Sequence, residues 1–259
     1  MRGATIILCS LSLFIQDSSS QQLNRKVTER KPCHKLAQAK SGDEVHVVYS
    51  GKLASNGKVF DSNTHKNPIH FELGKGLVIK GWDEGLVGTC IGEKLTLNIP
   101  SSLAYGEKGA GDGLIPPNAD LIFDVELVDV DKEIEIDTTK KGDCSNDKIT
   151  RKRDRVRINY VGKIAKPDGS LEVYDETYAT ELLPLTVGTV GIEGFDSGVS
   201  GACLGEERTV VVPPKKGYGE KGIEGLVPAN STLVWEIKVK HIEDRVLSFL
   251  DRISSGTFG

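Results

Sequence analysis

The chain has 259 residues, of which 33 are basic and 37 acidic, and its formal net charge is -4. This balance gives no basic surface of the kind that steers a protein to nucleic acid, so we expect no nucleic-acid partner. At roughly 150 residues per domain, the length favours two compact domains.

The chain starts with Arg2, an apolar run from Ala4 to Ile15 and three serines at 18–20. This pattern is typical of a secretory signal peptide, which we place at 1–20. The run is shorter than the about 20 apolar residues of a membrane-spanning helix, and no later stretch is long enough. We therefore expect a mature chain without a membrane span, in the endoplasmic reticulum lumen or secreted, where disulfides persist.

Alternating apolar residues and turn signals predict mostly antiparallel sheet with little helix, which is the α+β class. In the first half we expect strands at 45–49, 95–99 and 121–130, a hairpin turn at Asn56-Gly57 and one short helix within 81–88. In the second half we expect strands at 156–161, 209–212 and 233–239, a turn at Asp168-Gly169 and one short helix within 194–201. The two halves therefore follow one plan.

An internal repeat explains this plan. The stretch GWDEGLVGTCIGEKLTLNIP from Gly81 reappears 113 residues later as GFDSGVSGACLGEERTVVVP from Gly194. A period this long indicates a duplicated domain, because solenoid repeats run about 20 to 50 residues. We place the two domains at 33–131 and 143–244 and predict a charged linker between them at 132–142. Residues 245–259 are interpreted as an amphipathic tail.

Five cysteines occur, and Cys9 lies inside the predicted signal peptide. The other four form two pairs with matched separations of 57 and 59 residues, which predicts the bonds Cys33–Cys90 and Cys144–Cys203. Four cysteines nevertheless allow three connectivities. There is no Cys-x-x-Cys pair, and the histidines show no paired ligand spacing, so we expect no metal site and no cofactor.

Asn230-Ser231-Thr232 is an N-glycosylation sequon, and a secretory route would make it usable. It lies in an expected loop before a strand, so we predict a glycosylation site at Asn230.

The region 42–130 carries seven characteristic sequence words in order: VVYSGKL, GKVFDS, FELGKG, VIKGWDEGLVG, GEKLTLNIP, AYGEKG and IPPNADLIFDVEL. With these words the first domain resembles the FKBP-type peptidyl-prolyl isomerases, the immunophilins that bind rapamycin-like macrolides. The resemblance implies a twisted antiparallel half-barrel sheet wrapped around a short helix, with a pocket between sheet and helix. It also implies proline-containing polypeptide clients, with macrolides of the rapamycin type as possible inhibitors.

The resemblance carries the family's pocket onto ten positions, namely Tyr49, Phe60, Asp61, Phe71, Val78, Ile79, Trp82, Tyr105, Ile115 and Phe123. Trp82 would form the floor. Tyr105 and the backbone N–H of Ile115 would be candidates to bond the substrate carbonyls. Asp61 would either orient Tyr49 or interact with the twisting carbonyl, and the alternative is a structural role in which it satisfies buried backbone or hydroxyl donors. Ile69 and Lys66 depart from residues frequent in the family, which puts the affinity in doubt.

The second copy resembles the family less closely. It retains Tyr160, Asp175, Tyr218 and Val227, but it has Tyr174, Leu185, Phe195 and Trp235 where the first copy has Phe60, Phe71, Trp82 and Phe123. Gly191 stands at the position of Val78. We therefore expect weak or absent turnover in the second domain.

The implied chemistry needs no nucleophile. The barrier of about 18 to 20 kcal/mol arises from amide resonance, and an apolar cavity can favour the twisted, less polar amide. We expect a prolyl isomerase that assists folding in the secretory pathway, active mainly through its first domain. The alternative is a non-catalytic chaperone or a binding module for proline-containing segments.

Overall fold

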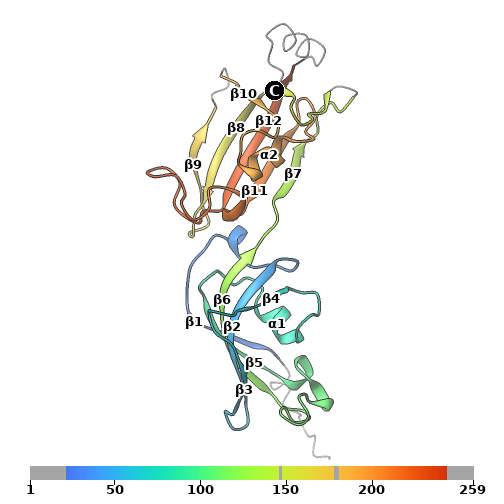
Figure 1. Ribbon diagram of the computed structural model, residues 1–259, viewed down its shortest axis with the longest axis vertical. Helices are drawn as coiled ribbons and strands as arrows, with labels where there is room; N and C mark the ends of the chain where they lie inside the picture. The colour runs from blue at the N-terminus through green and yellow to red at the C-terminus, as the bar shows by residue number, and fades with distance from the viewer. Residues whose placement is uncertain (1–21, 146–147, 178–180, 244–259) are drawn as a thin grey trace, which may run out of the picture.

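The computed structural model describes residues 22–145, 148–177 and 181–243. Two antiparallel sheets follow each other along the chain and lie end to end (Figure 1). One short α-helix accompanies each sheet in the described residues, so the predicted α+β class is confirmed. The predicted signal peptide at 1–20 and tail at 245–259 lie outside the described residues. No helix in the described ranges is long and apolar enough to cross a membrane.

The first half of the chain contains β1 (Asn24–Glu29), β2 (Glu44–Leu53), β3 (Val59–Ser62), β4 (Ile69–Glu72), α1 (Lys80–Gly85), β5 (Lys94–Ile99) and β6 (Leu121–Asp131). The second half contains β7 (Glu135–Lys140), β8 (Arg155–Ala165), β9 (Leu171–Glu176), β10 (Leu183–Thr186), α2 (Glu193–Val199), β11 (Glu207–Val212) and β12 (Leu233–Ile242).

Both sheets have the same topology. The first runs β1-β5-β6-β2-β3, with β4 also paired to β2, and the second runs β10-β8-β12-β11-β7, with β9 also paired to β8. Strand β7 thus occupies in the second sheet the edge position that β1 occupies in the first. The duplication seen in the sequence is therefore a duplication of the complete sheet, including its first edge strand.

The segment 132–142, predicted as a linker, contains strand β7. This strand pairs antiparallel with β11, with Glu135 opposite Val211. All six residues of β7 are exposed, so the strand lacks the alternation of apolar residues that signals a half-buried strand. Strand β1 is also almost wholly exposed and begins before residue 33, where we had placed the start of the first domain. Only residues 132–134 connect the two sheets.

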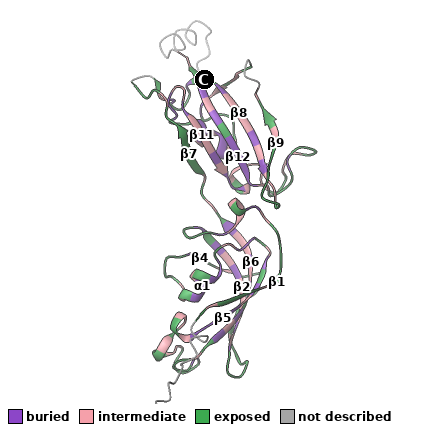
Figure 2. Ribbon diagram, turned by 180° about the vertical axis from the view of Figure 1, so that it is seen from behind, coloured by how far each residue is buried: buried purple, intermediate pink, exposed green. Residues whose placement is uncertain are grey.

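Each core lies between one face of its sheet and its helix. Alternate residues of the central strands, such as Val45, Leu97 and Val125, are buried in the first core, as the purple bands on the strands in Figure 2 show. The helix approaches closely because Gly81 has no side chain. A Cβ atom there would lie 2.4 Å from Cγ2 of Ile99.

Both predicted disulfides are present. Cys33 bonds Cys90, and Cys144 bonds Cys203, with Cα atoms 5.9 and 4.8 Å apart. By restricting the unfolded chain, a cross-link across loops of this length contributes about 4 kcal/mol to stability in the chain-entropy model.

Ion pairs surround the connection between the two sheets. Lys132 lies 2.5 Å from Asp43, and both side chains are more than nine-tenths buried. From the second domain, Lys215 Nζ lies 2.6 Å from Asp129 Oδ2, and Lys216 Nζ lies 2.5 Å from Glu133 Oε2. The short connection is therefore accompanied by charged contacts that join the two halves.

Candidate functional site

An aromatic cluster lies between the first sheet and α1. Its centre is Trp82, which α1 places against the sheet and which is only 3% exposed. The ring centroids of Tyr49, Phe71 and Phe123 lie 5.0, 5.8 and 5.2 Å from that of Trp82. Tyr49 and Phe123 meet the indole edge to face, which is a favourable arrangement of aromatic quadrupoles.

Gly51 on β2 makes room for two of these rings. A Cβ atom at this position would lie 2.6 Å from Phe123 and 2.8 Å from Phe60. Phe60, from β3, packs edge to face on Phe123 with a centroid distance of 5.6 Å. The missing side chain of Gly51 thus lets both rings pack against the backbone of the central strand.

Asp61 on β3 accepts a hydrogen bond of 2.5 Å from the Tyr49 hydroxyl. Burial, followed by the bond to Asp61 and its charge, raises the pKa of Tyr49, so the hydroxyl stays protonated at physiological pH. The bond to Asp61 fixes the orientation of the Tyr49 hydroxyl.

The remaining predicted site residues lie around this cluster. Val78 and Ile79 precede α1 and pack against the core. Tyr105 is 40% exposed, and its hydroxyl has no hydrogen-bond partner among the described residues. Burial, followed by the charge of Asp61, raises the pKa of Tyr105, so its hydroxyl remains a donor.

One expected role is wrong. The N–H of Ile115 donates a 3.0 Å hydrogen bond to the Ala110 carbonyl, so it is not free to bond a substrate. The N–H of Ile79, at the N-cap of α1, donates to no group in the described part of the chain. Sequence reasoning could have found this donor, because the first N–H groups of any helix lack intrahelical partners.

The second domain has a corresponding cluster in which two aromatic rings have exchanged places. Phe195 on α2 stands at the position of Trp82, and Trp235 on β12 stands at the position of Phe123. Their centroids are 5.2 Å apart, the same distance as in the first pair. Tyr160 packs on Phe195 at 5.6 Å, and its hydroxyl donates to Asp175. The exchange conserves the packing but moves the indole from the helix to the sheet.

The exchange also changes the polarity of the cluster. Trp235 Nε1 donates a 2.7 Å hydrogen bond to the hydroxyl of Tyr174, a residue that replaces Phe60. By contrast, Trp82 Nε1 is buried and has no partner among the described groups. The second cluster therefore contains a bonded polar pair where the first offers an unsatisfied N–H group.

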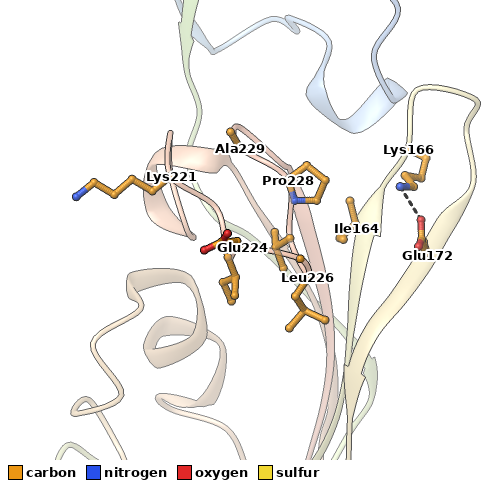
Figure 3. Close-up of a pocket in the computed structure, with 11 residues that line it drawn as sticks. Ile164, Lys166, Glu172, Lys221, Glu224, Leu226, Pro228 and Ala229 are labelled. Carbon is orange, nitrogen blue, oxygen red and sulfur yellow. Dashed lines mark ion pairs between the residues drawn. The ribbon is translucent and has the colours of Figure 1, made fainter.

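A separate cavity of about 370 Å³ lies between the hairpin of β8 and β9 and the loop 221–229 (Figure 3). Its apolar lining includes Ile164, Leu226 and Pro228, and the ion pair of Lys166 with Glu172 lies at its edge. Its lining contains no aromatic residue, but it includes Val227, which belongs to the same core as Phe195 and Trp235. The exposed sequon residue Asn230 follows this lining directly in the chain.

An aromatic cluster held between an antiparallel sheet and a short helix, once in each half of the chain, defines a protein of two tandem domains with one architecture. The chain belongs to the FKBP-type peptidyl-prolyl cis-trans isomerase family, whose model matches residues 36–128 and 146–240.

Two sequence relatives agree with this assignment, and one solved structure aligns with the chain. The chain is 38% identical over 224 residues to the human protein named peptidyl-prolyl cis-trans isomerase FKBP9, covering 83% of this chain and 37% of that protein. It is 52% identical over 128 residues to FK506-binding protein 2 of Candida glabrata, covering 49% of this chain and 91% of that protein. A solved structure of the three FKBP domains of wheat FKBP73 aligns with 85% of this chain and 94% of its own, at 26% identity and a TM-score of 0.39. The chain thus spans little more than a third of the length of the human relative.

Proposed function

We propose that the first domain catalyses cis/trans isomerisation of Xaa-Pro bonds in polypeptides of the secretory pathway. The observation that carries the proposal is the cluster of Tyr49, Phe71 and Phe123 around the buried Trp82. Membership of an isomerase family and the two disulfides support the activity and the oxidising compartment.

The geometry supports catalysis by selective binding of the twisted amide. A twisted prolyl bond loses resonance and polarity, so apolar aromatic walls favour it over the planar bond. The unpartnered N–H of Ile79 and the hydroxyl of Tyr105 are the donors that would hold the substrate carbonyls. Asp61 would act by fixing the Tyr49 ring rather than by transferring a proton.

In this proposal the second domain binds polypeptide with weak or no turnover. The bonded pair of Trp235 and Tyr174 presents a polar group where the first domain has the apolar Phe60 ring. Gly191 also removes the wall side chain that Val78 supplies. These two differences favour the interpretation of the second domain, and not of the first, as a module that binds polypeptide without catalysis.

Macrolides of the rapamycin type are the ligands we propose for the first cluster. The Candida glabrata relative is named an FK506-binding protein, and FK506 gives a probe for the same cluster here. Secretion and residence in the endoplasmic reticulum lumen both fit the disulfides.

The test compares matched floor substitutions in the full chain. Isomerisation of a short Xaa-Pro peptide is measured by NMR exchange for wild type, Trp82→Leu and Phe195→Leu. We expect Trp82→Leu to lower the rate at least tenfold and Phe195→Leu to leave most of it, with FK506 inhibiting the wild type. Circular dichroism checks that both variants are folded.

Two outcomes would contradict the proposal. A folded wild type without activity would leave a protein that binds proline-containing segments without catalysis. Loss of activity on Phe195→Leu, with Trp82→Leu unaffected, would place catalysis in the second domain.

A further inference from the structure

Six ligand-type side chains lie in two rows across β4, β2 and β6 in the first domain. The strand register pairs Glu44 with Glu72 on one side and Asp131 on the other, and it pairs His46 with His70 and Asp129. Neighbouring Val45 and Val47 point into the core, so Glu44 and His46 lie on the outer face. The register therefore brings two imidazoles and four carboxylates together on one exposed face of the sheet.

Three of these side chains already converge. His46 Nε2 lies 3.2 Å from Asp131 Oδ2 and 3.7 Å from Glu44 Oε1, and the three ligand atoms all lie within 4.8 Å of one another. Ligand atoms of a tetrahedral zinc ion, at bond lengths near 2.0 to 2.1 Å, stand about 3.4 Å apart. The His70 ring stacks on His46 with centroids 5.5 Å apart, which supports the orientation of the ligating ring.

Among the described residues, two lysines pair with three of the four carboxylates on this outer face. Carboxylates placed opposite each other on neighbouring strands repel, and here Glu72, Glu44 and Asp131 form one row. Lys215 of the second domain bonds Asp129 and Asp131, and Lys75 lies 3.3 Å from Glu72. The patch thus already attracts a cation, supplied in this structure by the other domain.

We propose that Glu44, His46 and Asp131 bind a divalent transition-metal ion of the zinc class, in competition with Lys215. The imidazole decides the class of ion, because calcium and magnesium prefer all-oxygen sites whereas zinc accepts nitrogen with oxygen. Metal binding would break the ion pair between Asp131 and Lys215 and so weaken one contact between the two domains.

The duplication supplies an internal control. In the second sheet the positions of Glu44 and His46 are held by Arg155 and Arg157, and the register pairs these with Thr186 and Pro184 of β10. Two arginines repel a metal ion, so the site belongs to the first domain alone. The histidines at 46 and 70 show no ligand spacing along the chain, which is why no metal site was expected from the sequence.

The test is calorimetric titration of the full chain with ZnCl₂ in a buffer that does not bind metals. We expect one saturable site per chain, weakened at least tenfold in His46→Gln. His65→Gln is the matched control, because His65 is exposed and lies 3.1 Å from a carboxylate, Glu126, of the same domain. The His65→Gln variant should bind zinc with the affinity of the wild type. The Lys215→Ala variant should bind zinc at least threefold more tightly than the wild type.

NMR supplies an independent readout, since zinc should shift the His46 imidazole signal and leave that of His65 in place. Absence of saturable binding by the wild type, or wild-type affinity in a folded His46→Gln variant, would overturn the site. Unchanged affinity in Lys215→Ala would overturn the competition.

Discussion

The indole N–H of Trp235 donates its 2.7 Å hydrogen bond to the hydroxyl of Tyr174 within the second aromatic cluster. Both residues stand where the first domain has phenylalanine. The bond therefore stabilises the exchanged arrangement of rings, and its contribution can be measured.

Tyr174→Phe should destabilise the second domain by about 1–3 kcal/mol, because a buried indole N–H would lose its partner. Urea unfolding of the full chain measures the loss. Tyr218→Phe is the comparison, since it removes the hydroxyl that interacts with that of Tyr174 but leaves the acceptor of the indole N–H in place. Equal stability of Tyr174→Phe and wild type would show that Tyr174 is not needed to satisfy the indole.

Gly51→Ala should lower isomerase activity several-fold, because the new methyl group would displace Phe60 and Phe123. Gly162→Ala is the same substitution in the second domain, where the methyl group would meet Tyr174 at 2.8 Å. If the first domain carries the activity, Gly162→Ala retains it. Equal activity of the two variants would contradict the assignment of catalysis to the first cluster.

Lys132→Ala should cost about 3–5 kcal/mol of folding stability, because it removes the cation beside the buried Asp43 carboxylate and leaves the backbone N–H of Lys40 as its donor. Lys216→Ala, which removes a pair with the exposed Glu133, should cost at most about 1 kcal/mol. Urea unfolding of both variants gives the comparison. A loss below about 1 kcal/mol for Lys132→Ala would show that Asp43 finds compensation from water or from other donors.

Stability should fall as the pH rises above about 10, the ordinary pKa of a tyrosine. Burial first, and then Asp61, raises the pKa of Tyr49 in the folded chain. Above pH 10 the unfolded chain releases this proton while the folded chain keeps it, so the stabilisation present below pH 10 is lost. Urea midpoints at pH 9 and pH 11 should differ less in Tyr49→Phe than in wild type, and an equal difference would contradict the assignment.

The sequence predicted the central elements because their physical signals are local. Alternation around Val45 and Leu97 marked the inner strands, and the repeat at Gly194 marked the second domain. The exposed edge strands β1 and β7 were missed because both of their faces meet solvent and show no alternation.

The packing of the aromatic residues was predictable from the sequence, but their hydrogen bonds were not. The ten positions carried over by resemblance include the five rings that pack together in the first domain. The donor role predicted for Ile115 is wrong because its backbone N–H donates to the Ala110 carbonyl, in a turn that the sequence did not reveal. The exchange of Trp82 and Phe123 for Phe195 and Trp235 was visible in the sequence, whereas the bond from Trp235 to Tyr174 required the coordinates.

The three residues between β6 and β7 also bear on multivalent binding. A polypeptide long enough to reach both aromatic clusters would meet two sites joined by a short segment, of which Lys132 is buried against Asp43. For such a chain the second contact is intramolecular, with an effective concentration set by the span between the clusters rather than by a flexible tether. The protein would then bind clients long enough to reach both clusters more tightly than shorter clients.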